Sequence, residues 1–337
     1  MTKLKWILLV FGVLILGVGG YYTYSFYNFA AHISDKGGGR VLTNKAVSEV
    51  GKSYIPPKWE GQQRVNVLLL GGDSRGLDPS ELPRSDSIMV ASMDPVSKKA
   101  HLFSILRDTY VKIPDNGEDR INAAITTGGP NLAMKTVSDL LGIPIQYYVY
   151  TDFKGFMALV DSIGGIDFEV EKDMKWSDSE DNHLYDINLK KGMQHLDGKT
   201  ALQYVRFRHD AMSDFTRTER QRNFLKAVAS KLQTTSSIVK LPRILNAIDP
   251  YIETNLSINN MLKLVSLGFE AKSDGIVSAQ MPPTELLDVK TIRGAEVITT
   301  NKNKLQLYVK NLLEGNIADS GASPSPTPRA IPKAVKN

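Results

Sequence analysis

The chain has 337 residues, of which 42% are hydrophobic, and a formal net charge of +5. This composition supports a sizeable folded core and excludes a disordered chain. The net charge is modest and no basic stripe alternates with aromatic residues, so nucleic acid is not indicated as a partner; an anionic membrane surface or a polyanionic substrate explains the balance equally well. The absence of cysteine excludes disulfides, thiolate catalysis and zinc–cysteine sites.

The N-terminus predicts a membrane anchor. An uncharged stretch over residues 6–31 follows Lys3 and Lys5, and it is long enough to span a hydrocarbon core of roughly 30 Å. The two lysines predict a cytoplasmic segment at residues 1–5, and the tyrosines at the far end of the stretch are typical of a membrane interface. A cleaved signal peptide is the alternative, with Ala30 and Ala31 as a poor cleavage site.

The rest of the chain divides into three parts. Residues 32–63 contain a run of three glycines and a Pro-Pro pair, which predicts an extracellular linker. Residues 64–316 contain the periodic segments and predict one extracellular domain. Residues 317–337 are rich in serine and proline, which predicts a disordered tail.

Strands and helices mix throughout residues 64–316. Hydrophobic runs predict strands at 65–70, 86–93, 99–106, 147–150 and 166–170. Helical spacing predicts helices at 130–141, 153–163, 198–205, 217–233, 238–248, 258–269 and 302–313. This mixture favours a layered α/β domain.

Two carboxylates stand where strands begin or end. Asp73 follows the first core strand, and Asp86 opens the next one. If these strands are neighbours, the two carboxylates could share one cation, and Mg²⁺ usually takes one or two protein carboxylates plus water and phosphate oxygens. Two loop acids that cap turns are the alternative reading.

Arginines crowd into one short segment. Arg206 and Arg208 alternate across a phenylalanine and could face the same way if the segment is extended. Three more arginines begin the following helix, where cations oppose the helix dipole unless an anion is bound there. The five together are Arg206, Arg208, Arg217, Arg220 and Arg222. They favour an anion site, because the planar guanidinium matches phosphate oxygens; a solvated basic helix is the alternative.

Phe224, Val228 and Leu232 form a stripe at helical spacing. This spacing predicts core packing first and a groove for a lipid tail second. The five histidines show no metal-ligand spacing, and the sequence contains neither a Gly-x-Ser-x-Gly nucleophile elbow nor a P-loop.

These clusters, in this order behind one N-terminal anchor, closely resemble the LytR-CpsA-Psr (LCP) family of cell-envelope proteins. The matching motifs lie at residues 67–75, 84–89, 104–109, 121–124, 147–165, 192–208 and 214–222. The resemblance implies a three-layer α/β/α LCP-type domain with a central mixed sheet, behind one transmembrane helix, on the outer face of a Gram-positive-type bacterial cell membrane. Gly72 departs from the family pattern, in which a small aliphatic residue often stands.

The resemblance also implies roles for individual residues. Asp73 and Asp86 match the family's Mg²⁺ carboxylates, with Mn²⁺ as a possible substitute. Four arginines match its pyrophosphate-binding residues: Arg107, Arg206, Arg208 and Arg217. Further residues fall in its motifs with less defined roles: Arg75, Arg84, Arg220, Gln221 and Arg222. Of these, we expect Arg75, Arg84, Arg220 and Gln221 to bind the pyrophosphate as well.

The activity implied is a phosphotransferase reaction. A glycopolymer phosphate, such as wall teichoic acid or capsular polysaccharide, passes from a polyprenyl-pyrophosphate carrier to peptidoglycan. We expect Asp73, Asp86, Arg107 and Arg208 to be catalytic. The alternatives are a polyprenyl-pyrophosphate phosphatase that uses water as acceptor, and a membrane-tethered adaptor or regulator that binds the lipid-linked polymer without turning it over.

Overall fold

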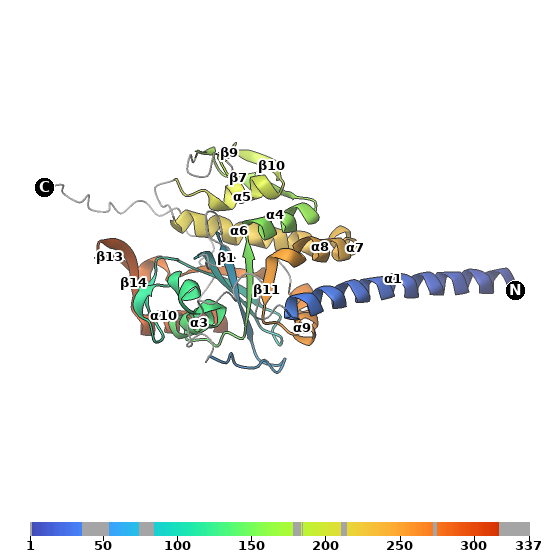
Figure 1. Ribbon diagram of the computed structural model, residues 1–337, viewed down its shortest axis with the longest axis horizontal. Helices are drawn as coiled ribbons and strands as arrows, with labels where there is room; N and C mark the ends of the chain where they lie inside the picture. The colour runs from blue at the N-terminus through green and yellow to red at the C-terminus, as the bar shows by residue number, and fades with distance from the viewer. Residues whose placement is uncertain are drawn as a thin grey trace.

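The computed structural model describes residues 2–35, 54–73, 84–177, 183, 185–209, 214–271 and 275–316. A mixed six-stranded sheet forms its centre, in the order β11-β6-β1-β2-β3-β12 (Figure 1). The strands are β11 (Ile252–Thr254), β6 (Tyr147–Asp152), β1 (Val65–Gly72), β2 (Ser85–Met93), β3 (Ala100–Ile105) and β12 (Val277–Met281). β1 runs parallel to β6 and antiparallel to β2, which confirms the predicted α/β fold with a central mixed sheet.

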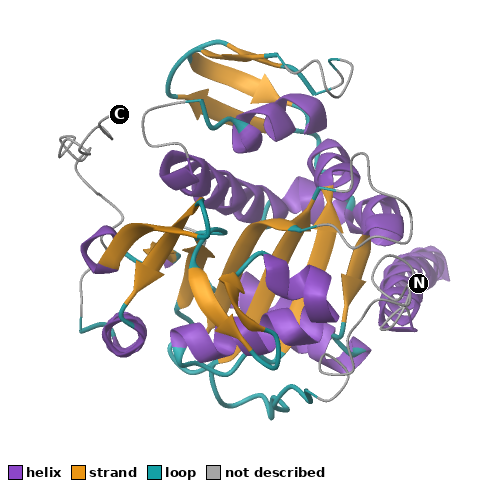
Figure 2. Ribbon diagram, turned by 60° about the vertical axis from the view of Figure 1, so that its left-hand side comes forward, coloured by secondary structure: helices purple, strands orange, loops and turns teal. Residues whose placement is uncertain are grey.

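Helices cover both faces of this sheet, as Figure 2 shows. The alternation of side chains along a strand sends Leu68 and Leu70 of β1 to one face and Val65 and Val67 to the other. The first face packs against α3 (Ala123–Leu141) and α10 (Lys302–Glu314). The second packs against α1 (Thr2–Asp35), α8 (Leu241–Ile248) and α9 (Ile258–Glu270). β1 is buried on both sides because a helical layer covers each of them.

A third cluster of buried side chains forms outside the strands of the central sheet. It joins α4 (Phe153–Ser162), α5 (Gly198–Arg206) and α6 (Asp214–Leu232) to the paired strands β7 (Ile166–Val170) and β10 (Gly192–Leu196). Phe224 of α6 is fully buried there against the rings of Phe156, Phe168 and Tyr204. Val228 is buried and Leu232 packs against the same cluster, so the predicted stripe is core.

Three short hairpins were not predicted from the sequence. They are β4 (Tyr110–Ile113) with β5 (Gly117–Arg120), β8 (Met174–Trp176) with β9 (Ile187–Leu189), and β13 (Leu287–Ile292) with β14 (Ala295–Thr300). β5 and β13 are mostly exposed, so they lack the buried hydrophobic runs that identify a core strand.

The helix predicted at 238–248 is confirmed over residues 241–248, but its first two residues belong to a separate helix, α7 (Thr235–Val239). Lys240 separates α7 from α8 and caps both helices. The break occurs here because Pro242, in the first turn of α8, has no N–H to donate and cannot continue a helix from the preceding turn. The helix predicted from Pro130 is confirmed. In α3 it follows a short helical segment, from which Gly128 and Gly129 separate it by leaving helical geometry.

α1 projects away from the domain and touches it with its C-terminal end (Figure 1). Phe29, Ala30 and Ile33 are buried there together with Trp59, which lies within the predicted linker. Within the part of the chain that the structure describes, no helix is both long enough and apolar enough to cross a membrane. Residues 36–53 of the predicted linker and the predicted tail at 317–337 lie outside the described residues.

Replacing Phe224 by alanine should lower the free energy of unfolding by about 3–5 kcal/mol, because the cavity left in the aromatic cluster cannot fully collapse. Denaturant unfolding of the purified protein measures this. Leu307→Ala is the matched control, since Leu307 is 59% exposed on α10 and its truncation should cost little. Equal losses in the two variants would contradict the assignment of Phe224 to the core.

Candidate active site

The antiparallel pairing of β2 and β3 brings a carboxylate and a guanidinium together. Met89 pairs with Ser104 in this register, which places the start of β2 beside the end of β3. Asp86 stands at that start, and Arg107 follows that end. Arg107 Nη1 donates to Asp86 Oδ1 over 2.6 Å. The sheet register therefore builds the first half of the site.

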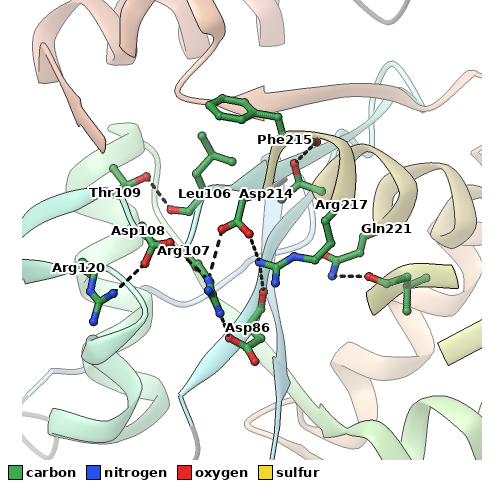
Figure 3. Close-up of polar contacts among 12 residues, drawn as sticks. Asp86, Leu106, Arg107, Asp108, Thr109, Arg120, Asp214, Phe215, Arg217 and Gln221 are labelled. Atoms are coloured by element: carbon green, nitrogen blue, oxygen red, sulfur yellow. Dashed lines mark hydrogen bonds and ion pairs between the residues drawn. The ribbon is translucent and has the colours of Figure 1, made fainter. Parts of the chain in front are cut away.

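The N-terminus of α6 supplies the second half (Figure 3). Asp214, the first residue of the helix, lies between two guanidiniums: Oδ2 is 3.3 Å from Arg107 Nε, and Oδ1 is 3.3 Å from Arg217 Nη2. Arg217 also reaches the backbone carbonyl of Asp86, at 3.5 Å. An acidic residue in the first turn is favoured by the helix dipole, and the i, i+3 spacing lets it meet Arg217. Sequence reasoning gave Asp214 no role, although this spacing was readable.

Charge balance decides how the two arginines behave. Burial lowers the pKa of Arg107, but Asp214, Asp86 and Asp108 outweigh it and raise that pKa above the usual value. Burial lowers the pKa of Arg217; Asp214 opposes this, and repulsion from Arg107 adds to it. Arg217 is almost fully buried and carries the less compensated charge of the two. Of these two arginines, Arg217 is therefore the one better suited to accept additional negative charge.

Arg206 belongs to α5, so the extended segment on which a shared direction of Arg206 and Arg208 depended does not form. α5 continues through Arg206, and Phe207 caps it in extended geometry. Arg206 donates to the Tyr185 carbonyl at 3.1 Å and lies over the rings of Phe153 and Tyr185. Arg208 is exposed, and it lies close enough to Arg217 to lower the pKa of that side chain by repulsion. Arg208 thus interacts electrostatically with Arg217.

The remaining residues of the α6 motif hold the fold around the site. Arg220 is buried, with Nε 2.6 Å from Glu171 Oε1 and Nη1 donating to the Phe207 carbonyl at 2.9 Å. Gln221 donates to the Val205 carbonyl at 3.2 Å. Arg222 donates to the Ser104 hydroxyl of β3. These contacts fasten α6 to α5 and to the sheet, and thereby fix where Arg217 stands.

Asp73 follows the end of β1, which lies beside the start of β2 because Gly72 pairs with Ser85. It lies near the buried hydroxyl of Tyr150, whose pKa is raised by burial and by the charges of Asp152, Glu253 and Asp73. A side chain at Gly72 would collide with that hydroxyl, which explains the glycine at this position. Arg84 is exposed immediately before β2, and Arg75 lies outside the described residues.

Comparison with known proteins shows which family the chain belongs to. The sequence matches the LytR_cpsA_psr family over residues 21–313. The chain belongs to this family.

Named relatives and solved structures are consistent with membership. The LCP chain is 34% identical over 77% of its length to the Staphylococcus aureus "Regulatory protein MsrR", covering 76% of that protein. It is 35% identical over 77% of its length to the Bacillus anthracis "Polyisoprenyl-teichoic acid–peptidoglycan teichoic acid transferase TagU", covering 81%. The crystal structure of B. subtilis TagV matches with a TM-score of 0.63 and 29% identity, over 75% of this chain and 97% of that one.

Two related structures contain ligands. TagT bound to LI-WTA matches with a TM-score of 0.61 and 28% identity, over 81% of this chain and 97% of that one. The LytR-CPS2A-psr family protein YwtF (TagT) with bound octaprenyl pyrophosphate lipid matches with a TM-score of 0.57 and 26% identity, over the same shares.

The two carboxylates that the sequence predicts as magnesium ligands offer the oxygen donors that this ion prefers. Asp73 and Asp86 supply only oxygen donors; among the described residues, no group of three or more histidine, cysteine or acidic side chains is placed so that it could hold a metal ion. Mg²⁺ takes one or two carboxylates and completes its coordination with water and phosphate. Asp152 and Glu253 act on the same tyrosine as Asp73, so negative charge accumulates on that side. Asp86 already accepts a hydrogen bond from Arg107.

Asp214→Asn should lower the free energy of unfolding by about 3 kcal/mol in phosphate-free buffer, because two largely buried guanidiniums lose a shared carboxylate. Added inorganic pyrophosphate should then raise the Tm of the variant more than that of the wild type, since the anion takes the place of the missing charge. Thermal unfolding with and without pyrophosphate measures both effects.

Asp139→Asn is the control for this prediction, because Asp139 pairs with Lys135 on the partly exposed surface of α3, away from the cluster. An equal gain from pyrophosphate in the wild type and in Asp214→Asn would show that Asp214 does not occupy the anion position.

Proposed function

We propose that the protein is a phosphotransferase that moves a glycopolymer phosphate from a polyprenyl-pyrophosphate carrier to peptidoglycan. One observation carries this proposal: Arg107 and Arg217 meet around a single carboxylate at the end of β3, with Arg208 nearby. Guanidiniums converging on one point match the oxygens of a pyrophosphate. Family relatives named for teichoic acid transfer, or solved with a polyprenyl pyrophosphate, support the same class of substrate.

The reaction follows from this arrangement. The acceptor hydroxyl attacks the phosphorus on the sugar side, the new oxygen–phosphorus bond forms, and the bond to polyprenyl phosphate breaks with its electron pair leaving on that phosphate. Arg107, Arg208 and Arg217 stabilise the charge on the bridging and terminal oxygens, which is most of what phosphoryl transfer requires. Asp73 or Asp86 orients the hydroxyl and accepts its proton.

Magnesium would be held by Asp73 and Asp86 in this proposal. When bound, it would supply further positive charge to neutralise the phosphates. Arg217 of α6 and Arg107 after β3 would contact the same phosphates, so the cation and the arginines would share one anion.

We also propose that the chain is a single-pass cell-membrane protein with the LCP domain outside. The proposal rests on the uncharged sequence of residues 6–31 after Lys3 and Lys5. A lipid-borne substrate requires such a location, because its polyprenyl chain stays in the bilayer.

Arg208→Ala should reduce the rate of transfer by about 10²–10³-fold, by analogy with the loss of one charge-stabilising donor, and should leave the fold intact because Arg208 is exposed. The assay incubates the full chain in detergent with a short polyprenyl-pyrophosphoryl glycan, peptidoglycan oligomers and Mg²⁺, and detects the glycan-phosphate adduct by mass spectrometry. Asp86→Ala should also abolish the adduct, and so should removal of Mg²⁺ with a chelator.

Arg293→Asn is the matched control, because Arg293 lies in the exposed β13–β14 turn and asparagine tolerates its positive φ of 52°. A wild-type rate in folded Arg208→Ala would remove Arg208 from the site. Polyprenyl phosphate released without an adduct would favour the phosphatase. Bound but unchanged lipid would favour the regulator, the function suggested by the name of the staphylococcal relative.

A further inference from the structure

α1 runs beside α7 where it leaves the domain. The Tyr22 hydroxyl donates to the Val239 carbonyl, the last residue of α7, at 2.5 Å. Farther along, α1 packs against α8 and α9 and buries Phe29 and Ile33. Figure 1 shows α7, α8 and α9 on the side of the domain from which α1 projects. The helix is therefore fixed to the domain from Tyr22 onward.

The length of the anchor then sets the depth of the domain, if the anchor proposed above spans the membrane. A bilayer core of roughly 30 Å needs about 20 helical residues. A span that starts at Trp6 would therefore end at Ser25. The residues from Trp6 to the last one before Tyr22 cover only about 24 Å. The final turn of the span thus lies at the level where α7 is already alongside the helix.

The surface of α7 suits this depth. The segment 235–240, which we call the α7 tip, exposes Ile238 by 43% and Val239 by 64%. Its five helical residues carry no charge, and two exposed cations follow them, Lys240 and Arg243. Apolar side chains beside cations are typical of segments that lie in a bilayer interface, where basic groups attract anionic lipids. The neighbouring face of α1 exposes Tyr24, a residue type enriched at that interface.

We propose that the α7 tip is immersed in the headgroup region of the membrane and that it sets the height of the active site above the bilayer. α6 leads directly into α7, and its helical rise places Arg217 roughly 22 Å before the end of α6 at Leu232. The phosphate of a carrier in the bilayer is drawn out along this distance to reach the arginines. The inference deepens the proposed function, because it names the surface that positions a membrane-bound substrate.

Single cysteines test the depth directly, because the chain has no native cysteine. Val239→Cys, Leu16→Cys and Val289→Cys, each labelled with a nitrobenzoxadiazole probe, are reconstituted as full chains in vesicles of equal parts phosphatidylglycerol and phosphatidylcholine. Dithionite added outside the vesicles reduces only probes that are exposed to the outside water. The rate of reduction is therefore compared only for chains whose domain faces outward. Leu16 tests the anchor, and Val289, exposed on β13, is the control in water.

The expected result is slow reduction at Val239 and at Leu16 and fast reduction at Val289. Reduction at Val239 as fast as at Val289, with Leu16 still protected, would overturn the immersion of the α7 tip and leave the anchor standing. Fast reduction at all three positions would remove the proposed anchor, and this inference with it. Neither result would affect the phosphotransferase assay in detergent, so the two proposals fail separately.

A second experiment reads out function. Ile238→Asp with Val239→Asp should lower transfer from a long-chain carrier embedded in vesicles by about tenfold, because carboxylates are unfavourable at the bilayer. The same variant should keep the wild-type rate with a short-chain carrier in detergent, which excludes a folding defect. Val289→Asp is the matched control and should keep both rates. Equal rates of the double variant and the wild type on vesicles would overturn the proposal.

Discussion

Two guanidiniums held around one carboxylate are the constraint on which the site depends. Arg107 and Arg217 come from distant parts of the sequence, repel each other, and are both largely removed from water. Asp214 offsets that repulsion because it lies 3.3 Å from each. The β2–β3 register supplies Asp86 for the same purpose. An anion that enters can take over the role of these carboxylates, so the fold holds the arginines ready for phosphate without leaving their charges uncompensated.

The sequence predicted much of the fold because burial on both faces of a sheet leaves a readable pattern. β1 is hydrophobic along nearly its whole length, since a helical layer covers each of its faces. Helix ends were readable where glycine adopts a positive φ, as Gly142 does after α3. Exposed hairpins such as β4–β5 carry no such pattern. The signal of the β4–β5 hairpin is instead its turn, where Asp115 and Gly117 adopt a positive φ, and an analysis of hydrophobic runs does not detect it.

The site was predicted less completely, for a related reason. Which residues of an arginine-rich segment face the site depends on where a helix ends, and α5 ends at Arg206 itself. One further helical residue is enough to send Arg206 to the ring of Phe153 while Arg208 lies near Arg217. The same limit applies to Gly72: a glycine motif is visible in the sequence, but the tyrosine hydroxyl that requires it comes from another strand, β6.

α6 links the chemistry to the proposed position of the membrane. Its first turn carries Arg217, and the fully buried Phe224 fixes its middle in the core. Its end leads into α7, which contacts α1 at Tyr22. Because Arg220 and Arg222 tie the helix to α5 and the sheet, α6 cannot slide along its axis without breaking buried contacts. The sequence predicted that Arg220 and Gln221 bind substrate. In the structure their contacts keep α6 in a fixed position. In the proposed arrangement, this rigid helix between the arginine cluster and the α7 tip would hold the site at a fixed height above the bilayer, whatever polymer the lipid carries.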